Sequence, residues 1–414
     1  MAGDWKEQVE GMKQRFPWYT RLLEQPDAPL ADRAEALELH RLPLITASVL
    51  EAHYYADRNP LSERGDHYSY RTSGTSSGRR KAIYYSQRDE EAYLRIKRDV
   101  FRAILSPHGY RTAMADVGTG HAEATAVAIF RSMGMEVHSL SYRLPVERHI
   151  EQLSRIKPEV FYTMPSILDR ILLAADDPAA WGIRHVVLVG EMASPSWMAS
   201  VAERLHIGAA CITDTYGSIE IGTIAYYSHE HGRYLFAEGI TAEGVGAEAI
   251  GEDLAPLPEG EQVLVLSSSV REAFPALRYV TYDVVRDLRP IPADDSGTMR
   301  MSFRSIVKRI GPDLKHGEKI SIYDIEEAVY RHLRDAVIRI QMAGNALSVR
   351  VYSRQATQEL LERIRLELEN RIPAIGAMIR SGMLDRIEVI GCAVDDASDD
   401  ASRSAVKNKR IYYT

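Results

Sequence analysis

The alternation of helical and apolar stretches between residues 105 and 215 is the strongest constraint on what this chain can fold into. Short apolar runs of strand length are separated there by longer stretches of helical character. Strands are predicted at 136–140, 159–163, 185–189 and 209–213, and helices at 123–133, 146–156 and 195–205. Strand–helix–strand spacing of this kind indicates a mainly parallel sheet covered by helices. The predicted fold class is therefore α/β.

The segments on either side have a different texture. The beginning of the chain indicates short helices and turns, and a longer helix is predicted at 88–105. After Tyr226 the sequence predicts a β-rich subdomain of the same large lobe, with strands at 233–237, 262–267, 277–282 and 299–303. A small α+β region follows, with helices at 325–333 and 358–371 and strands at 337–342, 346–351 and 386–390. Because 414 residues exceed what one core usually supports, we predict two domains, residues 1–306 and 307–414.

Composition excludes several classes of protein. The net charge of −7 argues against nucleic acid as the main partner, because that affinity comes mostly from clustered Lys and Arg. No apolar run approaches the ~18 residues that cross a bilayer, and the N-terminus does not resemble a secretion signal. Cys211 and Cys392 lack metal-ligand spacing and are interpreted as buried thiols in a reducing compartment, which predicts a cytoplasmic protein. The thirteen histidines show no metal-binding grouping, so a protein-bound zinc is not expected.

The loop from Tyr70 to Lys81 concentrates the residue types that bind phosphate. It holds five Ser or Thr residues, two glycines and four cations. Glycine lets several backbone N–H groups turn toward one point, and the hydroxyls and cations add donors and charge. A Walker phosphate loop is excluded, because only three residues separate Gly74 from Gly78 and no Gly-Lys-[Ser/Thr] follows. The loop therefore indicates nucleotide binding of another kind, with an ordinary flexible loop as the alternative.

Five motifs in a fixed order extend this interpretation. They are Thr72–Gly78, Asp214–Glu220, Arg278–Asp283, Gly317–Glu326 and Lys407–Arg410. Their order and spacing resemble the adenylate-forming superfamily of acyl- and aryl-CoA ligases and adenylation domains, in particular its short phenylacetate–CoA ligase branch. The resemblance covers essentially the whole chain. It implies a large adenylation domain that binds ATP and an acid, and a small mobile C-terminal domain that carries a catalytic lysine.

The resemblance assigns the pyrophosphate end of ATP and the metal to two of these motifs. The backbone N–H groups and hydroxyls of the first would wrap the β- and γ-phosphates. The residues concerned are Thr72, Ser73, Gly74 and Thr75. Glu220 would hold Mg²⁺, a hard cation that takes carboxylate and phosphate oxygens. The alternative for Glu220 is a solvated carboxylate in a turn after a strand.

The nucleoside would be held by two further strand ends. Tyr216 offers an aromatic face to adenine, Gly217 permits close backbone approach, and Asp214 and Thr215 belong to the same nucleotide-binding motif. Asp283 would accept hydrogen bonds from both ribose hydroxyls through its two oxygens. Taken alone, an aspartate at the end of a strand is more often a turn or cap residue.

The acid would be recognised near the carboxyl ends of the parallel strands, where open α/β sheets bind ligands. Gly190 and Glu191 follow the strand predicted at 185–189 and match the wall of the family's acyl pocket. His121 matches the region where the family places an aromatic residue or histidine near the substrate carboxylate. Its alternative is a purely structural hydrogen bond.

The C-terminal tail carries the residue that matters most for rate. An ammonium beside the α-phosphate stabilises the charge that builds up there in the transition state. Matching the branch's Gly-Lys-x-Lys-Arg ending selects Lys407, whereas an Asn-Gly-Lys pattern selects Lys409, and a solvated basic tail is the alternative. Arg309 and Asp313 match the family's hinge region. Arg278 is left outside the site, because a structural ion pair explains it equally well.

The resemblance implies ATP-dependent activation of a carboxylic acid as an acyl-adenylate, with release of pyrophosphate. The acyl group would pass to a thiol of CoA or of a phosphopantetheine-bearing carrier protein, and the acid would be small and aromatic, such as a phenylacetate, benzoate or dihydroxybenzoate. Two alternatives remain open at this point. The chain could transfer AMP or an acyl group to a cofactor or protein, or bind a nucleotide without catalysis.

Overall fold

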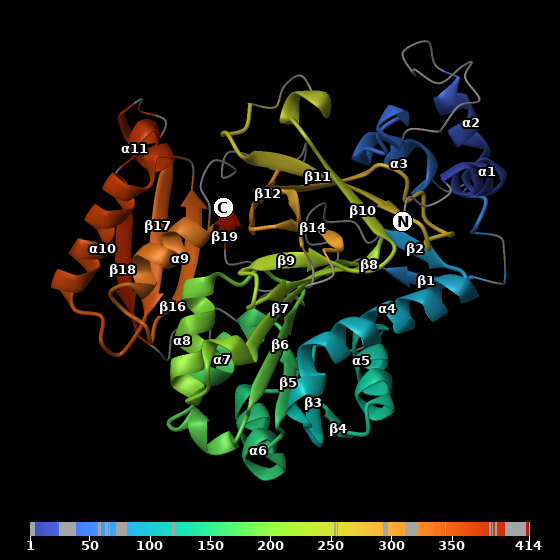
Figure 1. The fold of residues 1–414 in the computed structure, drawn as a ribbon. Helices are drawn as coiled ribbons and strands as arrows, with labels where there is room; N and C mark the ends of the chain where they lie inside the picture. Colours follow the sequence, from blue (N-terminus) through green and yellow to red (C-terminus); the bar gives the residue numbers. More distant parts are fainter. Residues whose placement is uncertain are drawn as a thin grey trace. The chain divides into compact units, whose positions relative to one another are not determined.

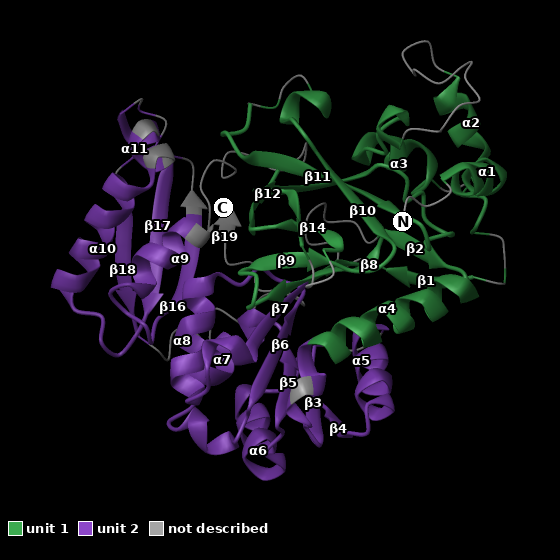
Figure 2. Cartoon of the chain, viewed as in Figure 1, with its two compact units in different colours: residues 1–103, 216–311 green, residues 104–215, 312–414 purple. Residues whose placement is uncertain are grey.

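The structure is a computed structural model, drawn in Figure 1. It describes residues 5–24, 39–56, 59–62, 65, 67–71, 81–117, 121–251, 254, 256–292, 297–310, 322–343, 345–380, 382, 384–385, 387–393 and 411–413. Figure 2 colours its two compact units, of which the first comprises residues 1–103 and 216–311 and the second residues 104–215 and 312–414. The predicted domain division after residue 306 is a different partition, and it stays a prediction.

A parallel sheet forms the centre of the second unit. Its strands run in the order β7-β6-β5-β3-β4, and every neighbouring pair is parallel. The strands are β3 (Thr112–Asp116), β4 (Glu136–Ser139), β5 (Val160–Thr163), β6 (His185–Val189) and β7 (Ile212–Ser218), and the intervening helices are α5 (His121–Ser132), α6 (Val146–Ile156), α7 (Pro165–Ala174) and α8 (Pro195–Leu205). Side chains of α7, α8, β5 and β6 share one hydrophobic core. The helix-covered parallel sheet predicted from the alternation is confirmed.

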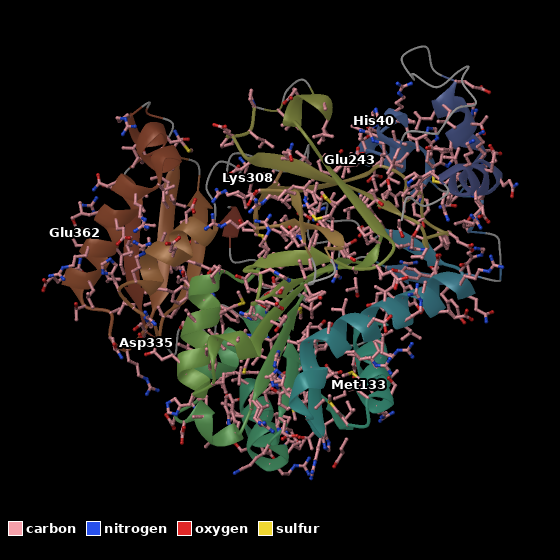
Figure 3. All side chains as sticks on the ribbon, viewed as in Figure 1. His40, Met133, Glu243, Lys308, Asp335 and Glu362 are labelled. Atoms are coloured by element: carbon pink, nitrogen blue, oxygen red, sulfur yellow. The ribbon has the colours of Figure 1, made fainter. Side chains whose placement is uncertain are left out.

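The C-terminal segment adds a small α+β layer to the same unit. Its sheet has the order β18-β17-β16-β19. The strands are β16 (Val337–Ala343), β17 (Ala346–Tyr352), β18 (Glu388–Cys392) and β19 (Ile411–Tyr413), and the helices are α9 (Ile322–Tyr330), α10 (Gln358–Arg371) and α11 (Pro373–Arg380). Ile325 and Val329 of α9 belong to the same core as Val201 of α8. Beside this layer, the hydroxyl of Ser353 donates to the carboxylate of Asp335, which is labelled in Figure 3.

The first unit is rich in strands, as predicted after Tyr226, and these strands pair antiparallel. One sheet contains β10 (Ile240–Val245), β11 (Glu261–Ser268), β12 (Tyr279–Arg286) and β15 (Ser305–Arg309), and a second group contains β13 (Arg289–Pro292), β14 (Met299–Phe303), β9 (Arg233–Phe236) and β8 (Gly222–Ser228). A separate hairpin pairs β1 (Tyr68–Arg71) with β2 (Ala82–Tyr85). The helices are α1 (Trp5–Arg15), α2 (Pro17–Leu23), α3 (Ala47–His53) and α4 (Gln87–Leu105), the last of which ends just inside the second unit. The predicted phosphate loop therefore joins the two strands of this hairpin.

Two local predictions are corrected. The strand predicted at 209–213 begins only at Ile212, because Ala209–Cys211 form a 3-10 turn. Cys211 and Cys392, predicted to be buried, are partly exposed. Among the described residues no helix is long and apolar enough to span a membrane.

Lys97 of α4 provides a test of how the first unit is stabilised. Its side chain is 3% exposed, and burial lowers the pKa of its amine to about 7. Between that value and the ordinary 10.5, the unfolded chain binds more protons than the folded one, so stability rises with pH. Lys97→Met is expected to raise the free energy of unfolding by about 2 kcal/mol or more below pH 7, with a gain that shrinks as the pH rises.

Urea unfolding across this pH range measures the effect of the Lys97 substitution. Arg102→Met on the exposed side of the same helix is the control and should change stability by no more than about 0.5 kcal/mol. A gain in stability for Lys97→Met that does not depend on pH would mean that holding the charged amine in the folded protein costs no free energy.

Candidate functional site

Tyr216, Asp283 and Arg309 form a connected polar group in the first unit. The Tyr216 hydroxyl donates a 2.5 Å hydrogen bond to Asp283 Oδ2, and Arg309 Nη1 lies 3.9 Å from Asp283 Oδ1. The strand register places Asp283 of β12 opposite Arg309 of β15. Burial and the neighbouring Asp283 charge raise the pKa of Tyr216 well above its usual value, so the phenol stays a neutral donor. The contact brings together two of the predicted nucleotide-binding residues, Tyr216 and Asp283.

The backbone at Asp283 departs from a regular strand. Tyr282 has φ of 64°, and the register of β12 against β11 shifts across this segment. A left-handed conformation in an aromatic residue costs about 1–3 kcal/mol and persists only where surrounding contacts enforce it. The enforcing contacts include a hydrogen bond from Ala47 N to the Tyr282 hydroxyl, 2.9 Å, and one from Asp283 N to Thr281 Oγ1, 3.1 Å. The kink thereby fixes the direction in which the Asp283 carboxylate leaves the strand.

Glu220 lies in the turn between β7 and β8 and is half-buried. Its carboxylate makes no hydrogen bond or ion pair with another described residue. Burial, and then the negative charge of Glu220, raises the pKa of Tyr55 and of Tyr279. The described residues contain no group of three acidic, His or Cys side chains that could cage a metal. A single carboxylate can serve as a Mg²⁺ ligand beside phosphate oxygens and water.

Other residues of the Asp214–Glu220 motif make contacts within the protein that stabilise the fold. A Cβ on Gly217 would lie 2.7 Å from the carbonyl oxygen of Gly222, so glycine is required there by the chain's own packing. The Thr215 hydroxyl donates to the Leu188 carbonyl at 2.5 Å, and Asp214 is buried. Asp214 and Thr215 are counted in the second unit, whereas the motif continues into the first.

The residues predicted to contact the acid are in the second unit. Glu191 accepts hydrogen bonds from Ser166 N and Ser166 Oγ, both 2.7 Å, and thereby caps the first turn of α7. Gly190 has φ of 81°, which makes the turn out of β6. His121 is half-buried at the start of α5, and its carbonyl accepts from the Thr125 hydroxyl at 2.7 Å. The Glu191 carboxylate therefore already has a structural task.

Sequence reasoning missed a buried pair close to His121 in the chain. Asp116, the last residue of β3, lies 2.6 Å from His149 Nδ1, and both side chains are almost fully buried. This pair ties α6 to the carboxyl end of β3, and His149 Nε2 lies 3.2 Å from the Leu144 carbonyl. Burial raises the pKa of Asp116, against the opposing influence of His149. The available signal was an aspartate at the end of a strand in an alternating α/β region.

Of the remaining predicted residues, Arg278 and Arg309 make ion pairs and the others lie outside the described residues. Arg278 pairs with Glu243, labelled in Figure 3, at 2.6 Å, which supports the structural role considered for it. Arg309, predicted as a hinge residue, pairs with Asp283, and its hinge role stays a prediction. The following lie outside the described residues: Thr72, Ser73, Gly74, Thr75, Asp313, Lys407 and Lys409.

Comparisons with known proteins define the class. Residues 315–395 match the family model of the fumarate–diaminopropanoate ligase C-terminal domain. Over 381 residues the chain is 37% identical to the fumarate–(S)-2,3-diaminopropanoate ligase of Enterobacter agglomerans, which covers 92% of this chain and 93% of that protein.

Two solved structures establish the fold. 2-Hydroxyisobutyryl-CoA ligase in the postadenylation state with 2-HIB-AMP is 17% identical, with a TM-score of 0.72 over 99% of this chain and 87% of that one. Anthranilate CoA ligase with anthranoyl-AMP is 16% identical, with a TM-score of 0.54 over 85% and 71%.

The fold and these relatives identify an adenylate-forming, ATP-using ligase, which confirms the superfamily predicted from the five motifs. Within that class, the chain belongs to the fumarate–diaminopropanoate ligase family.

Proposed function

We propose that this chain activates a small dicarboxylic acid of the fumarate type with Mg·ATP and joins it to the amine of an amino acid. The observation that carries the proposal is the 37% identity, over 92% of the chain, to a ligase whose name specifies fumarate and diaminopropanoate. The aromatic acid and the thiol acceptor predicted from the motifs form the second candidate, supported by the likeness in fold to the anthranilate CoA ligase.

The first step forms the acyl-adenylate. A carboxylate oxygen of the acid attacks the α-phosphorus, and the bond to the pyrophosphate oxygen breaks. Asp283, held by Tyr216, would accept hydrogen bonds from the ribose hydroxyls. Tyr216 would lie beside the base, and Glu220 would hold the Mg²⁺. When bound, the metal would offset the negative charge of the phosphates. Lys407 would stabilise the charge that develops on the α-phosphate oxygens.

The second step forms an amide. The amine nitrogen attacks the acyl carbon, AMP leaves with the original carboxylate oxygen, and the nitrogen loses a proton to solvent. The 1–306 and 307–414 division belongs to this proposal, because rotation of the small domain would withdraw Lys407 and open a path for the amine.

In the pocket for the acid, Gly190 and Glu191 would form part of the wall, and His121 would hydrogen-bond to the substrate. Both Glu191 oxygens bind Ser166 in the first turn of α7, so the carboxylate is held toward that helix. Glu191 would therefore shape the pocket through its main chain and through α7, whereas His121 would donate to a substrate carboxylate.

Acid-dependent pyrophosphate exchange, followed by a product screen, tests this function. The acids are fumarate, other small dicarboxylates, benzoate, phenylacetate and dihydroxybenzoate, and the acceptors are diaminopropanoate, other amino acids, CoA and a carrier protein. We expect exchange with dicarboxylates and an amide product. Exchange with aromatic acids alone, or a thioester product, would contradict the proposal in favour of the second candidate.

The remaining alternatives have separate outcomes in the same screen. AMP transfer to a cofactor or protein without any acid-dependent exchange would identify an adenylyltransferase. ATP binding with neither exchange nor transfer would identify a non-catalytic nucleotide-binding protein.

A further inference from the structure

Arg271 is a buried cation that donates to the main chain of Glu220, to the main chain of Tyr84 and to the carboxylate of Asp89. The side chain is 6% exposed. Its Nε donates to the Glu220 carbonyl at 2.9 Å, and its Nη2 donates to the Tyr84 carbonyl at 2.7 Å. Its Nη1 pairs with Asp89, and its guanidinium carbon lies 3.7 Å from the centroid of the Tyr85 ring. One planar guanidinium therefore links α4, β2 and the turn that carries Glu220.

Asp89 makes this arrangement rigid. It is 2% exposed and accepts three main-chain hydrogen bonds besides its pair with Arg271. The donors are Ser86 N at 3.0 Å, Glu272 N at 2.7 Å and Ala273 N at 2.9 Å. A buried ion pair holds its geometry well when the remaining lone pairs are satisfied in this way. Asp89 thereby fixes the guanidinium of Arg271, whose other N–H groups donate to the carbonyls of Glu220 and Tyr84.

Tyr85 holds the same turn at the preceding residue. Its hydroxyl donates to the Ile219 carbonyl at 2.7 Å. Two consecutive carbonyls, those of Ile219 and Glu220, are thus bound by two side chains that stack on each other. Tyr85 ends β2, the strand that follows the segment 72–80. The turn of Glu220 is therefore tied directly to the strand that continues from the predicted phosphate loop.

We propose that Arg271, together with Tyr85, is a positioning pair that sets where the Glu220 carboxylate stands relative to β2, and so sets the affinity for Mg²⁺ in the Mg·ATP complex. The inference rests on the proposed function, because that function assigns the metal to Glu220. Holding the carbonyls of Ile219 and Glu220 fixes the peptide planes on both sides of the Glu220 Cα, and so the direction of its Cα–Cβ bond. Loss of groups that orient a metal ligand typically weakens the metal by about 10–100-fold.

Two variants with matched controls test the proposal. Arg271→Lys keeps a cation for Asp89 but cannot reach both carbonyls, because an ammonium lacks the planar fork. Its control is Arg233→Lys, an arginine 7% exposed and bonded to Ser302 and Asp287 in the same unit. Tyr85→Phe removes one hydroxyl, and its control is Tyr84→Phe, whose hydroxyl makes no hydrogen bond with a described residue.

The readout is calorimetric titration of each protein with ATP, once in the presence of Mg²⁺ and once in the presence of EDTA. The thermal midpoint of unfolding of each variant is measured alongside. For Arg271→Lys we expect Mg·ATP binding to weaken about tenfold or more while binding of metal-free ATP changes less than about threefold. Tyr85→Phe should shift in the same direction by about threefold, roughly the value of one neutral hydrogen bond. Both controls should leave the ratio of the two affinities unchanged, even where their thermal midpoints fall.

An equal weakening of both titrations, or the same change of ratio in Arg233→Lys, would overturn the positioning role and leave Arg271 as a stabilising residue only. Failure of the proposed function looks different. The wild-type protein would then bind no Mg·ATP, or bind it and show no acid-dependent exchange. The first result overturns both proposals, and the second leaves the positioning role to be decided by the affinity ratio.

Discussion

Lys407→Ala is expected to lower the rate of acyl-adenylate formation by about 100-fold or more, with little change in ATP affinity. The ammonium is assigned to the α-phosphate oxygens, where negative charge grows only as the carboxylate attacks. Removing it therefore destabilises the transition state more than the bound substrates. Single-turnover formation of the adenylate measures this rate, and a separate ATP titration measures binding.

The neighbouring Lys409→Ala is the matched control and should slow adenylate formation by less than about threefold, because only Lys407 is assigned to the α-phosphate. Amide formation from preformed acyl-adenylate should be nearly normal in both variants, because the lysine has no task in that step. If Lys409→Ala carries the loss, the catalytic assignment moves to Lys409. If neither variant slows adenylation while both bind ATP, the C-terminal lysine is not catalytic.

Asp283→Ala is expected to weaken ATP binding by about 30-fold or more, since hydrogen bonds to a charged group contribute about 1.5–3 kcal/mol. The carboxylate is directed by the kink at Tyr282 and held by Tyr216, so its position is set by the fold. The wild-type protein should prefer ATP to 2′-deoxy-ATP, and the variant should lose that preference. Titrations with the two nucleotides measure both effects.

Asp287→Ala is the matched control, because this aspartate follows the same strand but pairs with Arg233. It should leave the preference for the ribose hydroxyl intact. A wild-type protein without that preference, or an Asp283→Ala variant that keeps it, would show that Asp283 does not bind the ribose.

The fold was predictable where periodicity is strong. The bounds of α6, α8 and α10 agree with the predicted helices. In each helix polar and apolar residues alternate with the helical period, so the pattern is visible in the sequence. By contrast, α7 was missed because seven of its ten residues are buried, which removes that contrast. The strand β3 was missed because its sequence, Thr-Ala-Met-Ala-Asp, is poor in the β-branched and aromatic residues that mark strands.

Site residues could be predicted only where they belong to a recognisable sequence motif. Tyr216 and Asp283 were assigned separately to the nucleotide, and the structure joins them by a hydrogen bond. The Asp89–Arg271 pair joins residues 182 positions apart and forms no motif, so no sequence pattern could indicate it. The engagement of Glu191 with Ser166 depends in the same way on how two neighbouring strands end side by side. Such partners follow from the topology and not from local spacing.

The most direct test of the central claim follows one oxygen atom through the complete reaction. The acid is labelled with heavy oxygen in its carboxylate, and the products formed with ATP and the amine are analysed by mass spectrometry. An acyl-adenylate requires one labelled oxygen to leave in AMP, with unlabelled pyrophosphate and an amide as the other products. Labelled inorganic phosphate together with ADP would mean activation through an acyl phosphate, and would contradict the assignment of the reacting centre to the α-phosphate.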